Sequence, residues 1–120
     1  MSYLADMVSE NAANPAAGSV TLTGANTSNI LGAITFLAAF GSSPRFTTIR
    51  IYDSAGNWEV TKSLFNGSTG LTRDTLFASS TGARITFSTA VFVDCVANAE
   101  FLIGATAGNI LARINGQAMP

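Results

Sequence analysis

The sequence predicts a mainly β protein, an antiparallel β-sandwich or barrel with one or two short helices and extended terminal arms. From Arg45 onward, apolar and polar residues alternate in short runs, and Gly, Ser and Asn separate these runs at regular intervals. Such spacing is typical of antiparallel sandwiches and barrels. The 120 residues amount to a single domain, and neither a long linker nor an internal repeat divides them.

Residues 1–18 are predicted to form a short helix or an extended arm. Leu4, Met7 and Val8 recur at near-helical spacing, and Pro15 and Gly18 then end the pattern. The segment has no basic region and no long apolar run, so we do not expect it to be a signal peptide.

The core domain is predicted to span residues 19–100. A first strand is expected over residues 19–23, followed by a short helix over 32–40, where Gly41 suits the position after a helix end. The β-branched residues of this second segment leave a strand possible. Later strands are expected in "RFTTIRIY", "NWEVTKSLF", "LTRDTLFAS", "ARITF" and "AVFVDCV". Residues 101–120 are expected to form a C-terminal arm or an added hairpin.

The stretch "DSAGNWEV" at residues 53–60 contains the only tryptophan of the chain. Asp53 suits the start of a turn, and Gly56 and Asn57 suit positions that need a positive φ. We therefore predict a β-hairpin in which Trp58 is the first inward-facing residue of the returning strand. On this interpretation Trp58 is a structural anchor, and strand alternation turns Glu59 away from the core.

The low charge of the chain indicates a protein that is covered by neighbouring subunits. Charged residues make up 11% of the sequence, against roughly 25% in an ordinary soluble domain. We expect a homo-oligomer, with a trimer favoured, whose contacts come from the two terminal segments. The candidate interface residues are Leu4, Met7, Val8, Ile110, Leu111, Arg113 and Ile114. The net charge of −1 offers no basic patch for nucleic acid or for an anionic membrane.

The residue types that most enzymes need are scarce. The chain has no histidine and a single cysteine, Cys95, which excludes a Ser-His-Asp triad and a thiolate zinc site. Asp53 and Glu59 are the closest candidates for a pair of catalytic carboxylates. Asp53, Ser54 and Asn57 could offer oxygen ligands to calcium, but the distal glutamate of a calcium loop is missing. We expect no enzymatic activity, no metal and no cofactor.

Several motifs, in this order, resemble a domain of tailed-bacteriophage virion proteins. They are "VSENAANPAAGSVTLTGA" at residues 8–25, "FLAAFG" at 36–41, "YDSAGNWEV" at 52–60, "LTRDTLFASSTG" at 71–82, "ITFS" at 85–88 and "VFVDCV" at 91–96. The pairing of "GNWEV" with the "LTR…LFASS" segment is the most specific part. Two features depart from the family pattern: "TKSLFNGS" replaces a glycine-rich stretch after "WEV", and the residues after Glu100 have no counterpart.

The resemblance implies a virion structural protein without enzymatic activity, in contact with other virion proteins such as the major capsid protein or tail proteins. Because the domain stands nearly alone, we expect a small accessory capsid subunit, of the decoration or cement type or one that anchors a head fibre. A tail-associated adaptor or a tail-fibre base protein is the alternative. A carbohydrate-binding module, which would use exposed aromatics such as Tyr52, Phe65 or Phe77, is a third possibility from a different class.

Overall fold

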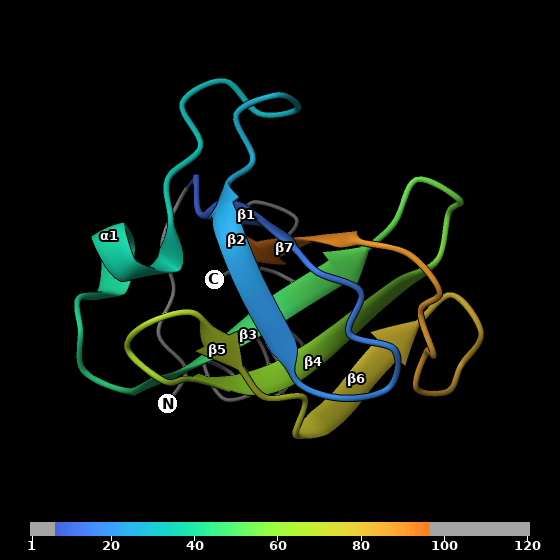
Figure 1. The fold of residues 1–120 in the computed structure, drawn as a ribbon. Helices are drawn as coiled ribbons and strands as arrows, with labels where there is room; N and C mark the ends of the chain where they lie inside the picture. Colours follow the sequence, from blue (N-terminus) through green and yellow to red (C-terminus); the bar gives the residue numbers. More distant parts are fainter. Residues whose placement is uncertain (1–6, 97–120) are drawn as a thin grey trace, which may run out of the picture.

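The computed structural model describes residues 7–96, and these residues confirm a mainly β, antiparallel fold (Figure 1). Seven strands and one short helix follow one another along the chain. In order they are β1 Ser9–Ala12, β2 Val20–Ala25, α1 Phe36–Phe40, β3 Arg45–Tyr52, β4 Trp58–Phe65, β5 Gly70–Leu71, β6 Thr75–Ser79 and β7 Val91–Cys95. Within the described residues, no helix is long and apolar enough to cross a bilayer.

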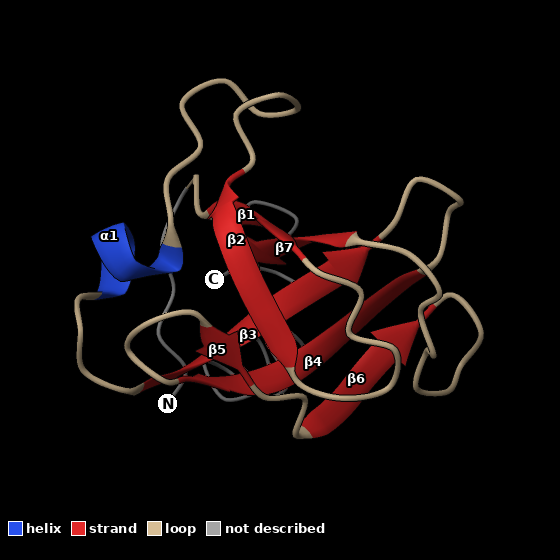
Figure 2. Cartoon of the chain, viewed as in Figure 1, coloured by secondary structure: helices blue, strands red, loops and turns tan. Residues whose placement is uncertain are grey.

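The strands form one sheet that closes on itself (Figure 2). Their order is β3-β7-β1-β2-β5-β4-β6, and the additional β3–β4 pairing closes the six strands from β3 to β4 into a barrel, with β6 paired to β4. β4 pairs with β3 along its whole length, from Arg45 opposite Phe65 to Tyr52 opposite Trp58. β5 and β6 pair with β4 at different points along its length. Closure of this kind removes the open sheet edges that would otherwise template aggregation.

The interior of the barrel is apolar at the end that α1 covers. Phe36 and Phe40 of the helix pack against Phe65 of β4, with ring centroids 6.0 Å apart in both cases. The helix begins at Phe36, later than the predicted residue 32, and ends as predicted, at Gly41 with a φ of 81°. Its start is late because Ile34 is engaged in a bridge with Val8, which holds the preceding backbone extended.

Residues 9–12 form a strand, so of the two predicted alternatives for the N-terminal segment, a short helix or an extended arm, the helix is wrong there. β1 lies between β2 and β7 and pairs with both. Two neighbouring strands offer the backbone hydrogen bonds that a helix would have made internally, and this tertiary pairing overrides a weak helical pattern. Val8, a predicted interface residue, is 3% exposed and belongs to the core.

The predicted strand "ARITF" at residues 83–87 is irregular in the structure. Ile85 and Phe87 still point into the core, but the backbone N–H of Ile85 donates to the Glu59 carboxylate, not to a neighbouring strand. The predicted C-terminal arm or hairpin lies outside the described residues, as do five of the candidate interface residues. These five are Leu4, Ile110, Leu111, Arg113 and Ile114.

Candidate functional site

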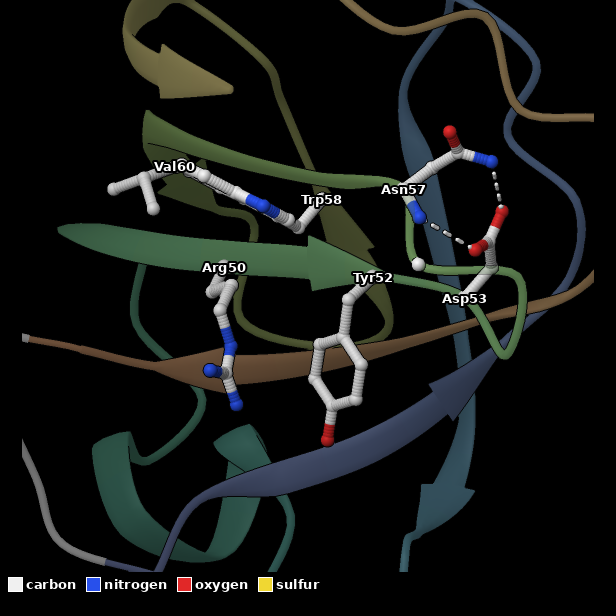
Figure 3. Close-up of a pocket in the computed structure, with 7 residues that line it drawn as sticks. Arg50, Tyr52, Asp53, Asn57, Trp58 and Val60 are labelled. Atoms are coloured by element: carbon white, nitrogen blue, oxygen red, sulfur yellow. Dashed lines mark hydrogen bonds between the residues drawn. The ribbon is translucent and has the colours of Figure 1, made fainter. Parts of the chain in front are cut away.

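The candidate site is an open hollow of about 430 Å³ on the outer face of the β3–β4 hairpin. Figure 3 shows Arg50 and Tyr52 on β3 beside Trp58 and Val60 on β4, with the hairpin turn at one end. The lining residues are Arg50, Tyr52, Asp53, Gly56, Asn57, Trp58 and Val60. The register places Tyr52 opposite Trp58 and Arg50 opposite Val60, so these four side chains share one face of the sheet.

The turn that closes the hollow is held by the Asp53 carboxylate. One oxygen accepts hydrogen bonds from the backbone N–H groups of Ala55 and Asn57 at 2.9 and 3.0 Å, and the other accepts from the Asn57 amide at 2.9 Å. These bonds, the Asn57 amide first, hold the pKa of Asp53 below its usual range. Gly56 supplies a positive φ of 95°. Asn57, which we expected to need a positive φ as well, does not have one and acts through its side chain.

The predicted orientation of Trp58 is wrong. Its side chain lies on the outer face and is 37% exposed, whereas Glu59 is fully buried, at 0%. All along β4 the buried positions are odd-numbered, and they carry Glu59, Thr61, Ser63 and Phe65. The interior of the barrel at this strand is therefore mainly polar, and the apolar residues Trp58 and Val60 face outward.

Two arginines explain why a carboxylate occupies the interior. Arg73 donates two hydrogen bonds, of 2.8 and 3.1 Å, to the Glu59 carboxylate, and Arg84 donates a third at 2.6 Å. The Ile85 N–H adds a fourth at 2.9 Å. Burial by itself would raise the pKa of Glu59, but these hydrogen bonds and the two positive charges outweigh it and hold the pKa below the ordinary value. Glu59 is therefore a structural residue of the barrel interior.

The pair of carboxylates considered from the sequence is not brought together as a catalytic pair. Asp53 is bound within its own turn, and Glu59 is bound inside the barrel by Arg73 and Arg84. Across residues 7–96 no group of three or more acidic, histidine or cysteine side chains could hold a metal ion. The oxygen ligands considered for calcium, Asp53 and Asn57, bond to each other.

A polar chain borders the hollow on the β7 side. Asp94 accepts hydrogen bonds from Arg50 at 2.6 Å, from Ser9 at 2.5 Å and from Tyr52 at 3.4 Å. The Arg50 guanidinium also lies 4.4 Å from the centre of the Tyr52 ring. Burial, together with the Asp94 charge, raises the pKa of Tyr52. The positive charge of Arg50 is therefore already balanced by Asp94.

Of the aromatic residues considered from the sequence for binding, only Tyr52 lines the hollow. Phe65 is fully buried in the core, and Phe77 is half-buried on β6. Sequence reasoning missed Arg50 and Val60 as site residues. Strand alternation carried the necessary signal, because Arg50 and Tyr52 share a face, as do Trp58 and Val60. The missing fact was which face of β4 points inward.

Four exposed apolar side chains belong to Met7 and to residues 31–37, the segment that leads into α1. We call Met7, Leu31, Ile34 and Leu37 the apolar end; each is exposed. The Ile34 N–H donates to the Met7 carbonyl at 2.9 Å, and a β-carbon built on Gly32 would lie 3.4 Å from the Met7 side chain. Beside them is a smaller hollow of about 280 Å³ that includes Glu10 and Leu37. Burial raises the pKa of Glu10, against the opposing effect of a hydrogen bond from the Phe36 N–H.

Comparison with known proteins gives no relative. No protein-family model matches the chain, and neither a characterised protein nor a solved structure matches it. The functional argument therefore depends on the sequence and on the geometry of the described residues.

Proposed function

We propose that this chain is a structural subunit of a tailed-bacteriophage virion, without enzymatic activity. In this role it is a small accessory capsid subunit, of the decoration or cement type or one that anchors a head fibre. The observation that carries the proposal is the apolar end, four exposed apolar side chains at residue 7 and within residues 31–37 on a chain of low charge. The resemblance of the motifs to virion proteins gives the class.

The apolar end is suited to contact with a neighbouring subunit. Met7, one of the predicted interface residues, belongs to it, and Ile34 and Leu37 extend it. Removing apolar surface from water stabilises a contact by about 25 cal/mol per Å², so a cluster of this kind contributes more than exposed ion pairs do. Contiguous exposed apolar surface on a small protein is typical of interaction sites.

The state of the acidic side chains supports a structural role over a catalytic one. Asp53, Glu59 and Asp94 each accept at least three hydrogen bonds from neighbouring groups. A general acid or base must be available to a substrate within hydrogen-bond reach. These carboxylates instead stabilise the hairpin, the barrel interior and the outer face.

Light scattering on the purified protein tests the oligomer. The wild-type chain is expected to be an oligomer, with a trimer favoured, at micromolar concentration, and the double substitution Ile34→Ser with Leu37→Ser is expected to shift it toward monomer. Phe46→Ser is the matched control, because Phe46 is equally exposed but lies on the outer face of β3. A monomeric wild-type protein, or equal dissociation of both variants, would contradict the proposal.

The place in the particle is tested by electron microscopy of virions that lack the protein. Bare or fragile shells support the capsid subunit. Intact shells with missing tail appendages would instead indicate the tail-associated adaptor or fibre-base protein. Particles of normal appearance and stability would contradict a virion role.

A further inference from the structure

The hollow beside Trp58 has the size and walls of a small-molecule site. Its volume of about 430 Å³ falls at the lower end of the range of about 300–1,000 Å³ that is usual for ligand pockets. The Trp58 indole and the Tyr52 ring supply aromatic surface on neighbouring strands, and Val60 adds an aliphatic wall (Figure 3). A tryptophan that keeps 37% of its surface exposed at such a place is available for contact.

The charges around the hollow favour an uncharged ligand. Arg50 is paired with Asp94 at 2.6 Å, and the Asp53 carboxylate is occupied by three hydrogen bonds within its turn. A charged ligand would have to compete with these bonds. Arg50 nevertheless keeps donors to offer, because its side chain is 45% exposed and the bond to Asp94 uses one of the five N–H groups of a guanidinium.

The combination of aromatic faces with hydrogen-bond donors matches a sugar ring. One face of a hexose presents weakly positive C–H groups, which suit the negative face of an aromatic ring, while its hydroxyl groups accept and donate hydrogen bonds. We propose that this hollow binds a hexose ring of an uncharged saccharide, with Trp58 stacking on the ring, Tyr52 and Val60 bordering it, and Arg50 donating to its hydroxyl groups.

The lone tryptophan makes the test direct, because Trp58 fluorescence reports on the hollow itself. The full-length protein is titrated with glucose, galactose, mannose, N-acetylglucosamine and lactose, and with sialyllactose as a charged comparison. We expect a saturable change in Trp58 emission with at least one neutral sugar, with a dissociation constant of about 1 mM, as befits a small ligand. Sialyllactose is expected to bind no more tightly than lactose.

Substitutions of residues that line the hollow test whether the sugar binds there. Tyr52→Leu and Trp58→Ala, the latter followed by calorimetry, are each expected to weaken binding at least tenfold. Phe46→Leu is the matched control, because Phe46 is an exposed aromatic residue of β3 outside the hollow. The sugar dissociation constant of this variant is expected to stay within twofold of the wild-type value. Tyr52→Leu preserves the fluorophore and covers the case in which Trp58→Ala fails to fold.

Three results would overturn the proposal. The first is the absence of any emission change up to about 50 mM of every neutral sugar, since binding weaker than this is not specific. The second is unchanged sugar binding in both hollow variants. The third is a peptide segment of another subunit seated on Trp58 in the assembled particle, which would make the hollow a protein contact. The first two results do not depend on whether the protein belongs to a virion, so they separate the failure of this proposal from the failure of the proposed function.

Discussion

At the scale of single residues, the barrel depends on a carboxylate that sequence patterning would place on the surface. Glu59 is buried because Arg73 after β5, whose side chain is only 2% exposed, and Arg84 after β6 both reach it. A buried ion pair is tolerated only when its lone pairs and protons are satisfied, and Glu59 meets this condition with four hydrogen bonds. The same inward turn of Glu59 places Trp58 on the outer face.

Replacing this carboxylate is therefore expected to be costly. Glu59→Gln leaves the buried guanidinium of Arg73 without its counter-charge, and we expect a loss of about 3–5 kcal/mol in the free energy of unfolding. Arg84→Gln is the comparison, because Arg84 is partly exposed and Glu59 keeps Arg73; a loss of about 1–2 kcal/mol is expected there. Urea denaturation at neutral pH measures both, and equal losses in the two variants would show that the charge of Glu59 is not the cause.

The stability of the wild-type protein should depend on pH through the same group. The fold lowers the pKa of Glu59 from an ordinary value of 4.5, so its contribution is complete above that value and is lost as pH falls through the lower, folded value. A protonated Glu59 resembles glutamine, so the difference between wild type and Glu59→Gln is expected to shrink as pH falls below 4.5.

At the scale of elements, the turn between β4 and β5 supports the link that follows α1. Gly67 in this turn lies against the backbone of Ser42, and a β-carbon added at Gly67 would meet the Ser42 carbonyl oxygen at 2.2 Å. Gly67 also has a positive φ of 85°. The turn and the link therefore fit together only when residue 67 has no side chain.

Gly67→Ala is expected to destabilise the protein more than its matched control, Gly82→Ala. Gly82 has nearly the same positive φ, 81°, but nothing lies within 4 Å of an added β-carbon. The control should cost about 1–2 kcal/mol from the backbone alone. Gly67→Ala should cost about 1–3 kcal/mol more, because the Ser42 backbone must move. Thermal denaturation compares the two, and equal midpoints would mean that the turn yields without strain.

The elements also show how far the sequence could be interpreted. Period-two alternation located β3, β4 and β7, because strand faces alternate wherever one side is buried. For β4 the alternation predicted the wrong inward face, because the residues that point inward, Glu59, Thr61 and Ser63, are polar. The partners of Glu59, Arg73 and Arg84, come from another part of the chain. β1 was missed for a related reason, since its strand conformation depends on β2 and β7.

At the scale of the whole molecule, closure of the sheet separates two surfaces of different character. β3 runs from the neighbourhood of α1, where Arg45 donates to the Phe40 carbonyl, to the hollow at Tyr52. The apolar end and the hollow have no residue in common and are therefore separate surfaces. The candidate site was thus predictable only in part: the sequence indicated the hairpin and Tyr52, whereas the hollow exists only because the register aligns β3 with β4.

This separation predicts that association and ligand binding are independent properties. Ile34→Ser with Leu37→Ser is expected to abolish association and to leave the neutral-sugar dissociation constant within twofold, and Tyr52→Leu is expected to do the reverse. Substitutions at sites that share no partner usually have additive effects, within about 0.3–0.5 kcal/mol, so the three substitutions combined should show the sum of the separate losses in unfolding free energy. Sugar titrations and light scattering on the same samples measure both properties. If the variant of the apolar end lost sugar binding while remaining folded, the hollow would have to be completed by a second subunit, and the two surfaces would form one shared site.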